Sequence, residues 1–279
     1  MSVTGPAPAI AIAGLVHVYP DGTRALDGVD LVVPSGQRLA IVGQNGSGKS
    51  TLVRHLDGLL RPTEGRVLID GRDAADLKVA QLAARVGLAF QDPDKQIFAR
   101  SVRAEVSFGP RNLGRRRAEL EAAVTAAIAA VGLAEHAATN PYDLGYSRRK
   151  LLALASILAM ETPTIVLDEP TTGQDARGIA RIQAVVAELA AAGRTVLAIS
   201  HDMRFVAESF ERVVVMRAGR VTFDGPPGDA FAEARWPVLE ATNLEPPLAA
   251  RIGARVGLGP TPTDAALVEA LASGGAGAS

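Results

Sequence analysis

The sequence contains no cysteine, which excludes disulfides, thiolate metal sites and thiol nucleophiles. Aromatic residues make up only 4% of a chain that is 48% hydrophobic, so the core must consist mainly of Ala, Val, Leu and Ile. The formal net charge is only -1, whereas proteins that bind nucleic-acid backbones are usually strongly basic. We therefore expect an ordinary globular protein without a nucleic-acid partner.

Long hydrophobic runs are also missing. The strongest run, "LLALASILAM", is far shorter than the ~20 residues that a transmembrane helix needs, so it predicts a buried helix. The first residues, "MSVTGPAPAIAIAGLV", lack the charged start of a signal peptide and favour a leader into a first strand. A length of 279 residues fits one compact domain, alone or with a small appendage.

The order of local patterns predicts an α/β fold. Short β-type segments and turns alternate over residues 9–70, and later apolar runs such as "TIVLDEP" and "TVLAISH" are typical of parallel strands covered on both faces. Residues 93–160 are Ala-rich and predict a helical insertion into this sheet domain. The apolar spacing between Leu52 and Leu60 predicts a helix that Pro62 ends.

These patterns suggest three parts along the chain. Residues 9–225 form the main domain, with the helical part at about 93–160. Residues 226–270, with paired prolines and short apolar helices, suggest a small C-terminal appendage. Residues 271–279, ending in "SGGAGAS", are predicted to be a disordered tail.

The stretch "GQNGSGKST", residues 43–51, matches the phosphate-loop pattern G-x-x-x-x-G-K-S/T between a predicted strand and a predicted helix. Its glycines let backbone N–H groups surround phosphate oxygens, Lys49 adds a cation, and the Ser50 hydroxyl can reach Mg²⁺. The alternative is a Gly-rich turn with a surface lysine. The residues predicted to bind the nucleotide here are Gly43, Gln44, Asn45, Gly46, Ser47, Gly48, Lys49, Ser50 and Thr51.

The stretch "IVLDEP" ends a predicted buried strand in two adjacent carboxylates, Asp168 and Glu169. One carboxylate can hold Mg²⁺ through water, and the next can polarise the water that attacks the γ-phosphate. Such a pair alone is most often a solvated turn. With a phosphate loop upstream, it favours hydrolysis.

Weaker candidates follow other strands. His201 in "SHD" is placed to reach a γ-phosphate, although such histidines are usually structural or exposed. Gln91 ends "GLAFQ", and Tyr19 in "VYPDG" either stacks on an adenine ring or closes a hairpin.

In this order, the motifs over about residues 10–225 closely resemble the nucleotide-binding subunit of ATP-binding cassette (ABC) transporters. The resemblance implies a P-loop NTPase fold with a RecA-like core, an N-terminal antiparallel β subdomain and a helical subdomain. It also implies ATP and Mg²⁺ as cofactors, and two subunits that close head to tail over two ATP molecules.

The resemblance assigns a role to each motif. Tyr19 would stack on the adenine, and Gln174–Asp175 would belong to the D-loop. The implied catalytic residues are Glu169 as the base, His201 as the switch histidine and Gln91 of the Q-loop. The implied metal ligands are Ser50, Gln91 and Asp168.

The segment "FQDPDKQIFARSVRAEVSFGPRNLG", residues 90–114, resembles the ATPases of energy-coupling factor (ECF) importers, a group that includes cobalt and nickel uptake systems. The resemblance implies a peripheral ATPase at the cytoplasmic face of the membrane, with a transmembrane coupling subunit and a membrane substrate-capture subunit. The cargo would be a vitamin or a transition-metal ion. Ile97 and Phe98 would either face the coupling subunit or pack within the insertion. The alternatives are the ATPase of a conventional ABC importer and a non-transport nucleotide-binding regulatory protein.

The signature segment departs from the family pattern. Where the family reads close to "LSGGQ", this chain reads "LGYSR", with Gly145 at the serine position and Arg148 at the glutamine position. We predict a helix beginning near Ser147, with Ser147 as N-cap or phosphate ligand and Arg148 or Arg149 as an added guanidinium. The predicted trans-acting residues are thus Gly145, Ser147 and Arg148. We expect a non-identical ATPase partner with the ordinary signature, while a homodimer stays open.

Overall fold

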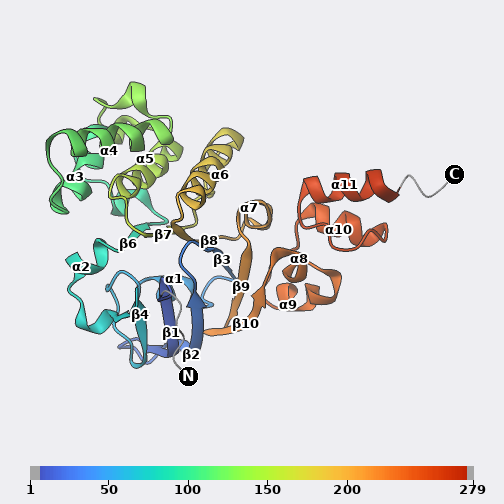
Figure 1. Ribbon diagram of the computed structural model, residues 1–279. Coiled ribbons are helices and arrows are strands. Elements are labelled where there is room, and N and C mark those ends of the chain that lie inside the picture. The colour runs from blue at the N-terminus through green and yellow to red at the C-terminus, as the bar shows by residue number, and fades with distance from the viewer. Residues whose placement is uncertain (1–6, 275–279) are drawn as a thin grey trace.

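The computed structural model describes residues 7–274 and contains two β-sheets, a group of helices above them and a C-terminal helical region (Figure 1). The first sheet is antiparallel, in the order β2-β1-β4-β5. Its strands are β1 (Ile10–Val18), β2 (Arg24–Val33), β4 (Glu64–Ile69) and β5 (Arg72–Asp73). The predicted N-terminal antiparallel portion is therefore present.

The second sheet carries the predicted parallel core, in the order β10-β9-β3-β8-β7-β6. Pairings from β9 to β6 are parallel, and only β10 runs antiparallel to its neighbour. The strands are β3 (Arg38–Val42), β6 (Val86–Ala89), β7 (Thr164–Asp168), β8 (Thr195–Ile199), β9 (Arg212–Arg217) and β10 (Arg220–Gly225). Since β3, β7 and β8 are adjacent and parallel, the motifs that follow them meet at one edge.

The helical part lies above the parallel sheet in Figure 1. It contains α3 (Val102–Asn112), α4 (Arg117–Ala130) and α5 (Tyr146–Leu158). Ser101 caps α3 by accepting a hydrogen bond from the Ala104 N–H. Buried residues of these helices share one core cluster with β7, β8 and α6 (Ala176–Ala191), so the helical part packs directly on the strand that carries Asp168.

The helix after the phosphate loop is shorter than predicted. α1 covers only Lys49–Val53, and the chain continues in turns through Gly58, which has a φ of 79°. A left-handed residue cannot continue a helix, so the expected single apolar face is broken. Leu56 is still buried, but Leu59 is 56% exposed. A further short helix, α2 (Val79–Ala83), precedes β6.

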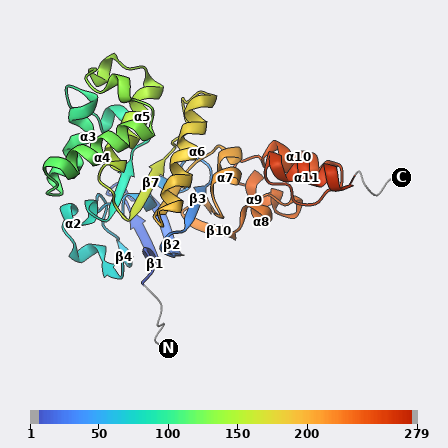
Figure 2. The same cartoon turned by 45° about the horizontal axis from the view of Figure 1, so that its top comes forward.

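The C-terminal region consists of short helices on the side of the sheet that carries β9 and β10 (Figure 2). After α7 (Met203–Ser209) and the β9–β10 hairpin come α8 (Pro227–Ala230), α9 (Trp236–Glu240), α10 (Leu248–Arg255) and α11 (Asp264–Gly274). Phe231, Leu239 and Leu244 are buried in the same core cluster as the parallel sheet. The first part of the predicted appendage is thus integrated into the main core.

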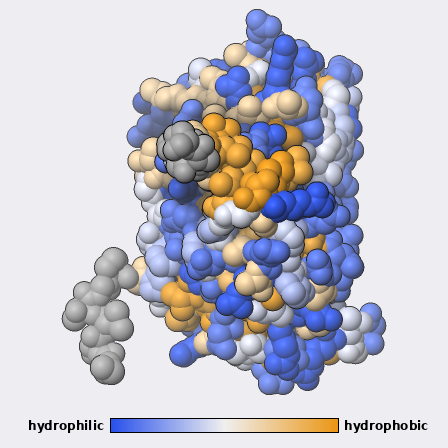
Figure 3. All heavy atoms as spheres, turned by 90° about the vertical axis from the view of Figure 1, so that its right-hand side faces the viewer, coloured by the Kyte–Doolittle hydropathy of each residue, from blue (hydrophilic) through white to orange (hydrophobic). Residues whose placement is uncertain are grey.

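The outer face of this region is apolar. Figure 3 shows a hydrophobic patch on the side that carries α10 and α11. The exposed apolar side chains of these helices and of the α10 C-cap are Leu248, Ile252, Val256, Val268 and Leu271. The predicted tail lies partly within α11, and residues 275–279 fall outside the described residues. Within residues 7–274, no helix is both long and apolar enough to cross a membrane.

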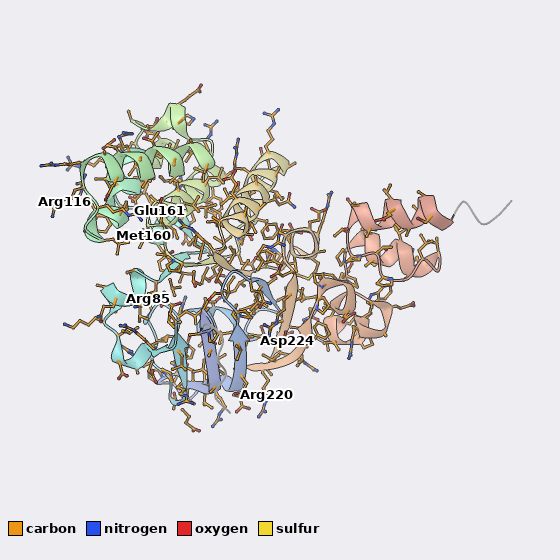
Figure 4. All side chains as sticks on the ribbon, in the orientation of Figure 1. Arg85, Arg116, Met160, Glu161, Arg220 and Asp224 are labelled. Carbon is orange, nitrogen blue, oxygen red and sulfur yellow. The ribbon has the colours of Figure 1, made fainter. Side chains whose placement is uncertain are left out.

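Arg212 joins the β9–β10 hairpin to the antiparallel sheet. Its guanidinium donates two hydrogen bonds of 2.6 Å to the carboxylate of Asp224, and another to the Val32 carbonyl oxygen at 2.8 Å. Figure 4 shows Arg220 and Asp224 on the outer strand β10, and Arg220 ion-pairs with Asp27 at 2.5 Å. These contacts connect the hairpin to β2 of the antiparallel sheet.

Candidate functional site

The phosphate loop is the turn between β3 and α1, as predicted. Gly43 and Gly48 have φ values of 148° and 101°, which favour glycine. A Cβ on Gly43 would lie 2.2 Å from the Met216 carbonyl oxygen, and one on Gly48 would lie 2.6 Å from that of Ala25. Both glycines are therefore required by the close approach of β9 and β2 as well as by backbone conformation.

Lys49 points back into the loop. Its Nζ donates hydrogen bonds to the carbonyl oxygens of Gly43 at 2.6 Å and Gln44 at 2.9 Å. Burial lowers the pKa of Lys49, and the nearby carboxylates of Glu169 and Asp168 partly oppose this effect. The loop thus holds an ammonium group where phosphate oxygens would need a cation.

A polar pocket unites most of the predicted site residues. The P-loop, the end of the Gln91 segment and the two adjacent carboxylates all contribute to its wall. Its lining residues are Asn45, Gly46, Gly48, Lys49, Ser50, Thr51, Gln91, Asp168, Glu169 and Ile199. Residues more than 100 positions apart are brought together because β3 and β7 both flank β8.

Asp168 has the features of a metal ligand. Burial, and then the charge of Glu169, raises the pKa of its carboxyl. Its buried Oδ1 has no hydrogen-bond partner among the described residues. Together with Ser50 and Gln91 on the same pocket, it offers the oxygen ligands that Mg²⁺ prefers. The residues present therefore fit a magnesium ion.

Glu169 is held in an unusual backbone conformation, with a φ of 51°. Its N–H donates to the Ile199 carbonyl oxygen at 2.9 Å, which ties it to the end of β8. Its Oε2 lies 2.7 Å from Nδ1 of His201, whose side chain is 61% exposed. The structure thus joins two of the polar residues that follow strands, Glu169 and His201, into one pair.

Tyr19 lies beside the phosphate loop, where its hydroxyl is 3.1 Å from Oγ1 of Thr51. Its ring meets the ring of His17 edge to face, with centroids 4.7 Å apart. His55 Nε2 lies 3.2 Å from His17 Nδ1, and His55 Nδ1 lies 2.8 Å from the Thr51 carbonyl oxygen. Sequence reasoning missed this buried histidine pair, which packs against the Tyr19 ring through His17.

The signature segment begins a helix near Ser147, as predicted, but its N-cap is a different residue. Gly145, not Ser147, is the N-cap of α5, and the helix begins at Tyr146. Ser147 Oγ donates to Oε1 of Gln174 at 2.8 Å, and Gln174 Nε2 donates to the Ser147 carbonyl oxygen at 3.0 Å. The expected N-cap role is therefore wrong, because Ser147 lies inside the first turn of the helix, and its hydroxyl donates instead to Gln174, 27 residues further along the chain.

The two arginines of this turn have different environments. Arg149 ion-pairs with Asp94 at 2.9 Å and donates to the Leu144 carbonyl oxygen at 2.8 Å. Arg148 is exposed. Of the two guanidinium groups considered from the sequence, Arg148 is the one that faces outward.

Lys150 is a further polar residue that sequence reasoning did not single out. It is only 7% exposed, and its Nζ donates to the Glu169 carbonyl oxygen. One available signal was its position on the helix: Lys150 lies one turn before Leu154, on the face that packs inward. A lysine on such a face needs a buried acceptor.

The proposed docking pair is divided by the structure. Ile97 is 3% exposed and belongs to the core, so of the two alternatives considered from the sequence it packs within the insertion. Phe98 is 57% exposed and meets Phe108 of α3 edge to face, with ring centroids 4.7 Å apart. The exposed aromatic surface is therefore Phe98 with Phe108.

Comparison with known proteins gives consistent family matches. Residues 26–172 match the model of a family described as "ABC transporter". An energy-coupling factor transporter ATP-binding protein of Symbiobacterium thermophilum is 43% identical over 86% of this chain and 85% of its own length. A putative ABC transporter ATP-binding protein of Methanosarcina acetivorans is 41% identical over 88% of this chain, which spans only 40% of that protein.

Solved structures show the same fold. The structure of cbiO1 from Clostridium perfringens, described as part of the ABC transporter complex cbiONQ, has a TM-score of 0.74 and 33% identity, covering 88% of this chain and 98% of that one. A dimeric ATP-binding cassette in a post-hydrolysis state with ADP and Pi has a TM-score of 0.72 and 26% identity, covering 78% and 98%. Both neighbours confirm the predicted P-loop ATPase fold.

Proposed function

Because the chain belongs to the ABC transporter family of ATP-hydrolysing nucleotide-binding domains, we propose that it powers an importer of the energy-coupling factor type. The ATPase activity follows from the family. The importer type is supported by the S. thermophilum relative and by the likeness to cbiO1. The cargo would be a vitamin or a transition-metal ion.

The observation that supports the site best is the single pocket that joins Lys49, Ser50, Gln91, Asp168 and Glu169. We propose that the phosphate loop binds the ATP phosphates, with Lys49 turning its ammonium from loop carbonyls to phosphate oxygens. Ser50, Gln91 and Asp168 would hold Mg²⁺, which neutralises charge on the β- and γ-phosphates. Tyr19 would stack on the adenine.

Glu169 is placed to act as the general base. Its carboxylate lies in the pocket within 2.7 Å of His201 Nδ1, so its orientation is fixed before a water molecule attacks. In this proposal, Glu169 accepts the proton of the attacking water, and His201 orients the carboxylate. Gln91, which lines the same pocket, would position the water and the metal.

Replacing Glu169 by Gln tests this assignment. Glu169→Gln keeps the side-chain shape but removes the proton acceptor, so turnover should fall at least a hundredfold with ATP affinity unchanged. Glu188→Gln, on the exposed face of α6, is the matched control. Robust turnover by Glu169→Gln would contradict the role of Glu169.

We also propose that the chain pairs with a non-identical ATPase subunit. Gly145 and Arg148 are exposed at the start of α5 and would face the partner's nucleotide, while the hydroxyl of Ser147 is engaged by Gln174. The half-site formed by "LGYSR" would then be the weaker one. Measuring ATP turnover of the purified chain alone and with its partner decides this, since full turnover by the isolated homodimer would exclude the need for a partner.

The membrane partners would meet the Phe98–Phe108 surface. This exposed aromatic pair lies at the start of the helical part, close to the Gln91 segment, and suits an apolar helix of a coupling subunit. The protein would then be peripheral at the cytoplasmic face of the membrane. We expect the chain to copurify with a small membrane protein and to lose that protein in Phe98→Ser. Association with a permease would instead favour the alternative function, the ATPase of a conventional ABC importer.

A further inference from the structure

Lys150 is a buried cation that contacts the backbone of the proposed catalytic base. It lines a small cavity together with the apolar side chains of Leu154, Leu167 and Ile182. At its end, Nζ donates to the Glu169 carbonyl oxygen, which also accepts a hydrogen bond from Thr172 N–H at 3.4 Å. A lysine is rarely fully buried unless its ammonium is paired, so this bond is the reason the residue is tolerated here.

The environment of Lys150 favours its charged form only in part. Burial lowers its pKa, and the charges of Glu169 and then Asp168 oppose that effect. The carboxylates of Glu169 and Asp168, which belong to the proposed site, therefore also favour the charged form of Lys150. Removing the ammonium would leave the Glu169 carbonyl with only the 3.4 Å hydrogen bond from Thr172 N–H, and would remove the cation that lies near Glu169 and Asp168 on the α5 side.

The backbone of Glu169 needs such support. Its φ of 51° is unfavourable for a residue with a Cβ, and such conformations persist only when neighbouring contacts fix them. The N–H of Glu169 is fixed by Ile199 of β8, and its carbonyl is fixed by Lys150 of α5. Two different elements thus determine the direction of the Glu169 side chain toward His201.

We propose that Lys150 is a positioning residue for ATP hydrolysis: it holds the Glu169 peptide in the orientation that aims the carboxylate at the attacking water. This inference rests on the proposed role of Glu169. Because Lys150 lies in the first turns of α5, just after Arg148, a shift of that helix also moves the group that holds the base. The signature segment and the base of one chain are thereby mechanically linked.

Three substitutions separate positioning from simple stabilisation. Lys150→Met keeps the volume but removes donor and charge, Lys150→Gln keeps a neutral donor, and Lys150→Arg keeps both. In the assembly that hydrolyses ATP, kcat of Lys150→Met should fall about tenfold to a hundredfold, the range expected for a lost charge-assisted hydrogen bond in the transition state. KM and the affinity for a fluorescent ATP analogue should change by less than about twofold, because Lys150 does not line the nucleotide pocket.

Lys150→Arg should recover most of kcat, and Lys150→Gln should lie between. Lys78→Met, at an exposed position before α2, is the control and should match the unmodified chain. If Lys150→Met does not fold, Lys150→Arg and Lys150→Gln are compared under conditions in which both have the same melting temperature. A higher kcat for Lys150→Arg supports the proposal, and equal kcat values for the two variants would overturn it.

The outcome for Glu169→Gln distinguishes this inference from the proposed function. An inactive Glu169→Gln together with a fully active, folded Lys150→Met overturns the inference alone. An active Glu169→Gln overturns both, since there would be no base to position.

Discussion

The reciprocal contact between Ser147 and Gln174 permits a quantitative test of what the unusual signature turn does. Two hydrogen bonds connect the residues, one from the Ser147 hydroxyl at 2.8 Å and one from the Gln174 amide at 3.0 Å. Ser147→Ala removes the first bond only, whereas Gln174→Ala removes both. Each such bond contributes about 0.5–1.5 kcal/mol net to stability.

We therefore expect Ser147→Ala to lower the free energy of unfolding by about 1 kcal/mol, and Gln174→Ala by about 1–3 kcal/mol. The double variant should be no less stable than Gln174→Ala alone, because the hydroxyl has already lost its acceptor. The coupling energy of the cycle should thus be about 0.5–1.5 kcal/mol. Urea unfolding at 25 °C measures these values, and each kcal/mol corresponds to roughly 2–4 °C in melting temperature for a chain of this size class.

Turnover supplies the second measurement. If Ser147 acts through Gln174, both single variants should change ATP turnover of the assembly alike. Additive destabilisation with no coupling would refute the hydrogen-bond interpretation. A loss of turnover confined to Ser147→Ala would instead show that its hydroxyl meets the partner's nucleotide.

Three other predictions concern the loop, the pH dependence and the hairpin. Lys49→Ala should weaken binding of a fluorescent ATP analogue about tenfold to a hundredfold, and unchanged affinity would contradict its phosphate role. Burial raises the pKa of Asp57 to about 6, so the folded state keeps a proton that the unfolded chain loses near pH 4, and stability should fall as pH rises through 6. Asp57→Asn should accordingly add about 1–2 kcal/mol at pH 8 and nothing at pH 4 in urea titrations, after allowance for partial solvent screening; an equal gain at both pH values would refute this. Arg212→Ala should cost about 2–3 kcal/mol, because its half-buried side chain makes a bidentate pair with Asp224 and a bond to the Val32 carbonyl oxygen, whereas Arg204→Ala, whose own side chain is 68% exposed, should cost under about 1 kcal/mol.

Local sequence determines where the main motifs of the site lie in the fold. The phosphate loop and the Asp168–Glu169 pair each follow a short apolar strand, and parallel strands necessarily bring their carboxyl ends to one edge. The phosphate loop, the carboxylate pair and, for Gln91, the family resemblance singled out the residues that the structure places on one pocket, among them Lys49, Gln91 and Glu169.

What the sequence could not determine depends on contacts between distant segments. The hydroxyl of Ser147 was assigned to a cap or a phosphate because its acceptor, Gln174, lies on another element. The burial of Lys150 depends on how α5 packs over β7, and Ile97 is buried by the same helical part. α1 ends at Val53, and the chain then passes through turns to the left-handed Gly58, a change that apolar spacing does not reveal.

The packing of the C-terminal region has a practical consequence for protein engineering. A fragment ending at residue 225, where the sequence patterns of the main domain end, would lack Phe231, Leu239 and Leu244 and expose the hydrophobic surface that they cover. It would also lose Asn243, whose amide donates to Gln44 of the phosphate loop at 3.0 Å. Hybrid ATPases built by exchanging this region between relatives should therefore join after α10 rather than at the hairpin, so that each recombined chain keeps its own core.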